Sequence, residues 1–82
     1  MRQQMVLVMD NLEAVLSAAE MTLTNVTMLS IFSTDVDQTM QNFDVLANRL
    51  GASGVKPPMT LVGVTRLALP GLMFELEAKA AD

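Results

Sequence analysis

The sequence has 82 residues, of which 51% are hydrophobic and only 4% aromatic, and its net charge is −4. It contains no cysteine, which excludes disulfides and thiol chemistry. It also contains no histidine, so a serine nucleophile would have no histidine base. The absence of both residue types argues against a metal site. Its five basic residues are scattered rather than gathered in a stripe, so nucleic-acid binding is not expected.

The apolar residues do not indicate a membrane protein. No uninterrupted run of about 18 apolar residues occurs. The start, Met1-Arg2-Gln3-Gln4, lacks the apolar core and cleavage site of a secretory signal, so a cytoplasmic protein is the default expectation. A chain this short cannot bury so large an apolar fraction by itself. We therefore expect sister copies of the chain to cover part of its surface.

The first predicted element is an amphipathic helix from Gln4 to Glu20. Acidic and small polar side chains occupy one face, and apolar side chains recur at helical spacing on the other. The apolar stripe consists of Met5, Val8, Met9, Leu12, Val15, Leu16 and Ala19.

A strand followed by a second helix comes next. Residues Val26 to Ser33 alternate between two partly apolar faces, which is typical of a central strand. Thr34 and Asp35 offer capping oxygens for a helix from about Val36 to Leu50. Gly51 stands where a helix C-terminus favours glycine.

Two further apolar runs, Met59 to Ala68 and Leu72 to Ala80, are predicted to be strands. The turn residues Leu69-Pro70-Gly71 between them indicate an antiparallel hairpin. The expected fold is α+β in the order α-β-α-β-β, with two helices on one face of a mixed or antiparallel sheet. The other face would be bare, and a neighbouring subunit or, as the alternative, a missing N-terminal piece would cover it. We expect that face to carry Leu29, Ile31, Leu61 and Leu67.

Several short strings, in this order and at this spacing, are similar to one family. They are Asn11-Leu12-Glu13-Ala14-Val15-Leu16, Phe32-Ser33-Thr34-Asp35, Pro57-Pro58-Met59-Thr60-Leu61-Val62-Gly63-Val64, Arg66-Leu67, and Phe74-Glu75-Leu76-Glu77-Ala78. Together they resemble the Rid/YjgF family of reactive intermediate deaminases, also called the RidA-like or L-PSP endoribonuclease/translation-inhibitor family. The resemblance covers nearly the whole chain as a single domain, residues 1–82. It implies a reduced form of the family's chorismate-mutase-like fold.

The sequence departs from that family at two points. Family members usually begin with additional strands before the first helix, so the chain resembles an N-terminally shortened member. In deaminating members, the residue after Pro-x in this strand is an arginine that clamps the carboxylate of a 2-imino acid; here it is Met59. A guanidinium makes two parallel charged hydrogen bonds to a carboxylate, and methionine makes none. The chain therefore resembles a subgroup that lacks the catalytic arginine.

The resemblance also suggests site residues. Glu75 aligns with the family's acidic residue near the reacting centre, which implies a catalytic carboxylate that positions the hydrolytic water. From the pattern alone, Glu75 and Glu77 equally fit the polar face of an edge strand. Met59, Leu61 and Arg66 are the candidate ligand-binding residues. Arg66 could replace the missing anion clamp, but alternation places it opposite Met59, and a surface or inter-subunit ion pair is the other interpretation.

No cofactor and no metal is expected, and the eight methionines are interpreted as packing residues of the core and interface. The resemblance implies a homotrimer whose inter-subunit clefts are lined by Met59, Leu61 and Glu75 of one chain. Three functions remain open. The chain is a ligand-binding protein that is not a standard 2-imino acid deaminase, an active imine or enamine deaminase (a hydrolase) that uses Glu75, or an assembly-competent fragment without catalysis.

Overall fold

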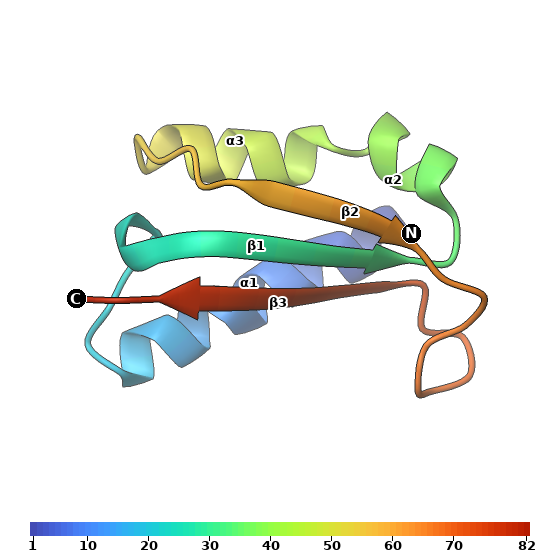
Figure 1. Cartoon of the computed structure of the whole chain (residues 1–82), viewed down its shortest axis with the longest axis horizontal. Coiled ribbons are helices and arrows are strands. Elements are labelled where there is room, and N and C mark those ends of the chain that lie inside the picture. Colours follow the sequence, from blue (N-terminus) through green and yellow to red (C-terminus); the bar gives the residue numbers. More distant parts are fainter.

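The strand predicted from Val26 to Ser33 forms the centre of the sheet. In the computed structural model, which describes residues 1–82, this strand, β1 (Val26–Ser33), pairs with β2 (Met59–Gly63) on one side and with β3 (Phe74–Ala80) on the other. β2 runs parallel to β1 and β3 runs antiparallel, so the sheet is mixed (Figure 1). The predicted class, α+β with helices on one face of a mixed sheet, is confirmed.

Two helices cover one face of this sheet. α1 (Arg2–Ala18) lies behind β1 and β3 in Figure 1, and α3 (Asp44–Ala52) lies beside β2. A short 3₁₀ helix, η1 (Leu23–Asn25), leads from α1 into β1. No helix has both the length and the apolar character needed to cross a membrane. The core between helices and sheet consists of Met5, Met9, Leu16, Leu23, Val26, Leu29, Ile31, Val45, Leu46, Leu50 and Phe74.

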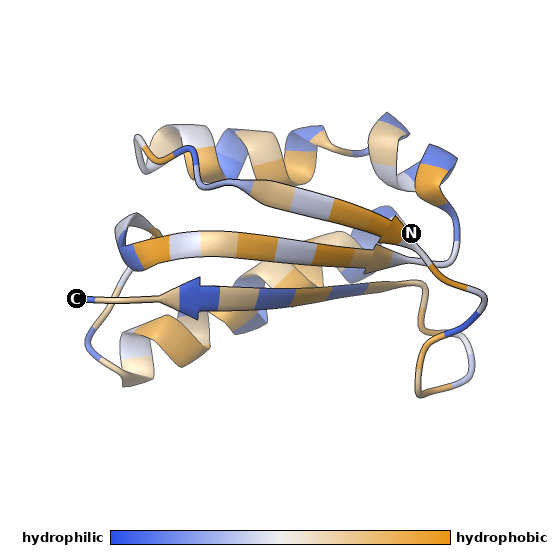
Figure 2. Cartoon of the chain, viewed as in Figure 1, coloured by the Kyte–Doolittle hydropathy of each residue, from blue (hydrophilic) through white to orange (hydrophobic).

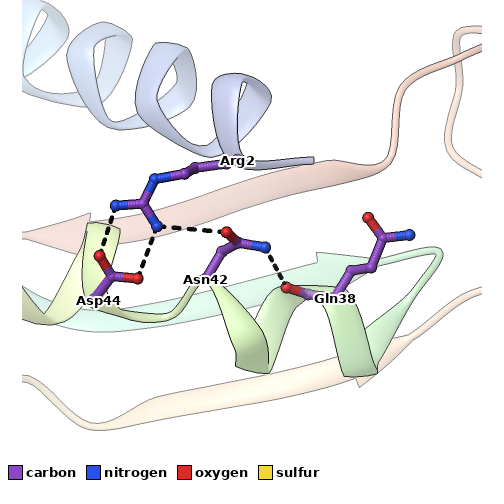
Figure 3. Close-up of polar contacts among 4 residues, drawn as sticks. All are labelled: Arg2, Gln38, Asn42 and Asp44. Atoms are coloured by element: carbon purple, nitrogen blue, oxygen red, sulfur yellow. Dashed lines mark hydrogen bonds and ion pairs between the residues drawn. The ribbon is translucent and has the colours of Figure 1, made fainter.

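The single helix predicted from Val36 to Leu50 is two helices, α2 (Val36–Gln41) and α3. Asp35 caps α2 as expected, because its side chain accepts a hydrogen bond from the Gln38 N–H at 3.0 Å. The break follows Asn42, whose side-chain amide donates to the Gln38 carbonyl at 2.8 Å and thereby ends the first helix (Figure 3). Gly51 lies inside α3 rather than after it, and Gly54 takes the positive φ of 73° beyond the helix.

The predicted hairpin between the last two strands is wrong. β2 ends at Gly63, β3 begins at Phe74, and both strands pair with β1 instead of with each other. The turn itself exists, because Leu72 N–H donates to the Leu69 carbonyl and Gly71 has a φ of 81°. It lies within the crossover 64–73, which passes the end of β1. β1 is apolar on both faces, as expected of a central strand, and it pairs with both β2 and β3.

The face of the sheet opposite the helices differs from the expected one in composition. Leu29 and Ile31 are only 0% and 1% exposed beneath the helices, because the β1–β3 register puts them on the same face as Phe74. Leu61 pairs with Ile31 and faces the helices as well, whereas Leu67 lies outside the sheet in the crossover. The face away from the helices, called the open face below, carries Met28, Ser30, Phe32, Thr60, Val62, Glu75, Glu77 and Lys79.

Candidate functional site

Glu75 projects from β3 on the open face, where it lies opposite Phe32 of β1. Glu77 and Lys79 follow it on the same face, because alternate residues of a strand share a face. Figure 2 shows the resulting alternation of hydrophilic and hydrophobic residues along β3. The carboxylate of Glu75 is exposed and belongs to none of the three ion pairs of the chain. Such a group is free to hold a water molecule or to pair with a neighbouring molecule.

Met59 and Leu61 lie on the other face. Met59 pairs with Leu29 and Leu61 with Ile31, so both side chains point toward the helices. Leu61 is half-buried against the core, and Met59 is 42% exposed at the edge of β2. Met59 lines a shallow hollow of about 260 Å³ between β2 and α3. The other residues of this hollow are Phe43, Ala47, Leu50, Gly51, Val55 and Lys56.

One chain therefore does not line a cleft with Met59, Leu61 and Glu75 together. The family resemblance implied that arrangement, but the mixed register places Glu75 on the opposite face of the sheet from Met59 and Leu61. A site that uses all three needs two chains, one of which offers the edge of β2 and the other the open face.

Arg66 lies beyond the end of β2, in the crossover 64–73. The argument from strand alternation does not apply to it, since the strand already ends at Gly63. It borders a separate hollow of about 440 Å³ formed by the crossover and Thr34. Neither Met59 nor Glu75 lines that hollow, so a single chain does not bring Arg66 to either candidate residue.

An apolar hollow beside β3 was not predicted. It measures about 430 Å³ and lies between α1 and the outer side of β3. Val15, which is 68% exposed, contributes to it, and Glu75 stands at its rim. The hollow is lined by Val8, Asn11, Leu12, Val15, Leu72, Phe74, Glu75, Leu76 and Ala78.

Two of the five basic residues of the chain form ion pairs between helices. Arg2 binds Asp44 with both guanidinium nitrogens, at 2.9 and 2.6 Å, and this lowers the pKa of the Asp44 carboxyl (Figure 3). Arg49 contacts Asp10 at 2.7 Å and Glu13 at 2.6 Å, which raises the pKa of the guanidinium. No group of three or more acidic side chains lies close enough together to hold a metal ion.

Comparison with known proteins identifies one family. The family model described as Endoribonuclease L-PSP matches residues 1–82. Among curated proteins there is no match. Rv2704 of Mycobacterium tuberculosis, a member of the YjgF/YER057c/UK114 family, is 33% identical with a TM-score of 0.80, and the match covers 88% of this chain and 59% of that one.

Two more distant structures show the fold alone. TdcF of E. coli, solved with bound serine, is 23% identical with a TM-score of 0.90, and 99% of this chain matches 64% of that one. The YjgF gene product of E. coli is 22% identical with a TM-score of 0.81, over 89% and 57% of the two chains. The chain thus spans less than two thirds of the length of each of these solved structures.

Proposed function

The chain belongs to the Endoribonuclease L-PSP (YjgF) family, and from that premise we propose that it binds a small, weakly anionic ligand in a cleft between subunits and does not hydrolyse ordinary 2-imino acids. The observation that carries this proposal is Met59, which stands where the resemblance implies the carboxylate-binding arginine. Without two parallel charged hydrogen bonds, a carboxylate that enters a protein cleft loses its hydration and gains little in return.

The surroundings of Met59 favour the same ligand class. The hollow that it lines is mostly apolar, and Lys56 is the single cation among its residues. Lysine supplies one compact charge on a flexible stem rather than a planar fork, so it does not replace a bidentate arginine. Apolar walls with one polar group at the rim suit a small ligand whose charge is low or partly shielded.

The assembly in this proposal is a homotrimer, which the family resemblance implies. Two features of the chain support association. The first is the open face, where Val62 is 39% exposed and Phe32 only half-buried. The second is the separation of Met59 and Glu75 on opposite faces, since only a second chain can complete a cleft that contains both. Each cleft would then combine the β2 edge of one subunit with Glu75 of its neighbour.

The test is ammonia release from freshly generated 2-iminobutanoate by the parent, Met59→Arg and Met59→Gln. We expect no turnover above the uncatalysed rate in the parent or in Met59→Gln, which matches arginine in polarity but not in charge. We expect a gain in Met59→Arg, because residue 59 is 42% exposed and a guanidinium there reaches solvent without burying its charge. Silence in all three variants contradicts the assignment of the clamp position to Met59.

A second function rests on Glu75, whose exposed carboxylate has no partner within the chain. A free carboxylate can orient a water molecule toward an electrophilic imine carbon and pass a proton to the departing amine. In that case the parent itself releases ammonia, and Glu75→Ala abolishes the activity while Glu77→Ala, two residues along the same face, retains it. Turnover in the parent that depends on Glu75 would replace the binding function with that of an imine hydrolase.

A further inference from the structure

The outer edge of β3 is an unpaired strand edge. β3 is the last strand of the sheet order β2-β1-β3, so only one of its sides is paired. The main-chain bonds that flank the strand show which groups face outward. Thr34 N–H donates to the Met73 carbonyl at 3.0 Å, and Ala81 N–H donates to the Asn25 carbonyl at 2.9 Å. Since the direction of main-chain groups alternates along an antiparallel strand, the N–H and C=O groups of Phe74, Leu76, Ala78 and Ala80 point away from β1.

This edge carries the charged side chains Glu75, Glu77 and Lys79, which oppose pairing with strands that do not match their charges. It contains no proline and no bulge on its outer side, and it borders the apolar hollow between α1 and β3. Val15 at 68% exposure leaves that hollow open on the side where a further strand would add. An extended edge with unpaired main-chain groups next to exposed apolar surface is a template for strand addition.

The side chains of β3 identify the partner as a second copy of the chain. We propose that two copies join antiparallel through β3, with Ala78 of each copy at the twofold axis, to form one continuous six-stranded sheet. In this register Glu77 of each copy lies directly opposite Lys79 of the other, on the open face. Directly opposed side chains of opposite charge stabilise a strand pair, and like charges destabilise it.

The same register satisfies the other requirements of an antiparallel pair. Ala78 faces Ala78 and Leu76 faces Ala80, so the outward main-chain groups of each copy meet those of the other. Glu77 and Lys79 then form the pairs without mutual main-chain hydrogen bonds, in which opposed side chains lie closer together. On the side of α1, each Leu76 lies opposite a small residue and has room beside the hollow. A register shifted to place Glu77 on the axis would bring two like charges together, and is disfavoured.

The test is sedimentation equilibrium of the intact chain and three variants, with circular dichroism to confirm that each is folded. Ala78→Pro removes an outward N–H without touching the β1–β3 ladder, so we expect it to halve the number of subunits. Lys79→Glu places like charges opposite each other twice and should raise the dissociation constant at least about tenfold. The double variant Glu77→Lys/Lys79→Glu restores both opposite pairs and should recover the assembly of the parent.

The possible results of this experiment distinguish the contact through the β3 edge from a trimeric contact through the open face. A parent whose subunit number is even, and falls by half in Ala78→Pro, supports the β3 pair whether or not the open face also associates. A parent that forms a trimer and is unaffected by Ala78→Pro and Lys79→Glu overturns the β3 pair and leaves the trimer. Failure of the double variant to recover the assembly overturns the proposed register, and a monomeric parent overturns both contacts.

Discussion

At the scale of single residues, the buried hydroxyl pair of Ser33 and Thr39 gives a sharp test of the packing between β1 and α2. The two side chains are 0% exposed, and their oxygens lie 2.7 Å apart. Thr39→Val keeps the shape but leaves the Ser33 hydroxyl without this partner, so we expect a loss of about 1–3 kcal/mol in the free energy of unfolding. Urea denaturation measures the loss. Thr60→Val, at an exposed position of β2, serves as the control and should change little.

Asp35 makes stability depend on pH through its role as the cap of α2. The N–H and side-chain amide of Gln38 donate to its carboxylate and lower its pKa below the ordinary value of 3.8. Because the folded-state pKa is depressed, the stabilisation is complete above pH 3.8 and is lost as the pH falls through the folded value.

The measurement is thermal unfolding of Asp35→Ala and Asp35→Asn across this range. Asp35→Ala should melt below the parent at neutral pH, and the difference should shrink below pH 3.8. Asp35→Asn keeps a capping oxygen without a charge, so its melting temperature should lie closer to that of the parent at neutral pH. A difference between parent and Asp35→Ala that is constant with pH contradicts the assignment.

At the scale of elements, two glycines near the end of α3 should respond to the same substitution with opposite signs. Gly51 is helical and a Cβ there would meet nothing within 4 Å, so Gly51→Ala should stabilise the chain by about 0.5–1 kcal/mol. Gly54 has a φ of 73°, which a side chain adopts only with strain, so Gly54→Ala should destabilise it. Urea midpoints for the two variants provide the measurement. Stabilisation by both substitutions would contradict the end of α3 as described.

The elements also show what local sequence can and cannot specify. The bounds of β1 and the cap at Asp35 follow from alternation and from one capping side chain, and both predictions are confirmed. The helix break at Asn42 has a local cause that the apolar pattern does not reveal, whereas the failure of the hairpin has a non-local cause. A side-chain bond back to Gln38 competes with helix continuation, and pairing with β1 outweighs a favourable Pro-Gly turn. Turn residues specify a reversal of the chain, but they do not specify which strands pair across it.

The candidate site was less predictable than the fold for the same reason. Alternation assigns Met59 and Leu61 to one face and Glu75 to one face of its own strand. Whether these are the same face depends on the register of two strands against a third, which no local pattern contains. The family resemblance pointed to Met59, Leu61 and Glu75 together, although a single chain places them on two different faces of the sheet. The hollow beside β3 escaped prediction because it depends on where the sheet ends relative to α1.

At the scale of the whole molecule, the open face is the surface that should respond to a single charge. Val62 lies opposite Phe32 on that face and is 39% exposed. If the open face is buried in a trimer, Val62→Lys places a charge in that contact and should dissociate it, because an unpaired buried charge costs several kcal/mol. Sedimentation velocity at micromolar concentration measures the change in mass.

The control is Leu69→Lys, at a side chain that is 66% exposed in the crossover and outside the sheet. It adds the same charge to the chain, so any general effect of net charge on association appears equally in both variants. Since Val62 is not part of the core, the melting profile of dilute Val62→Lys should remain cooperative while that of the parent shifts upward with concentration. An unchanged mass in Val62→Lys, or an equal loss in both variants, would remove the open face from the assembly and with it the neighbour that the cleft between Met59 and Glu75 requires.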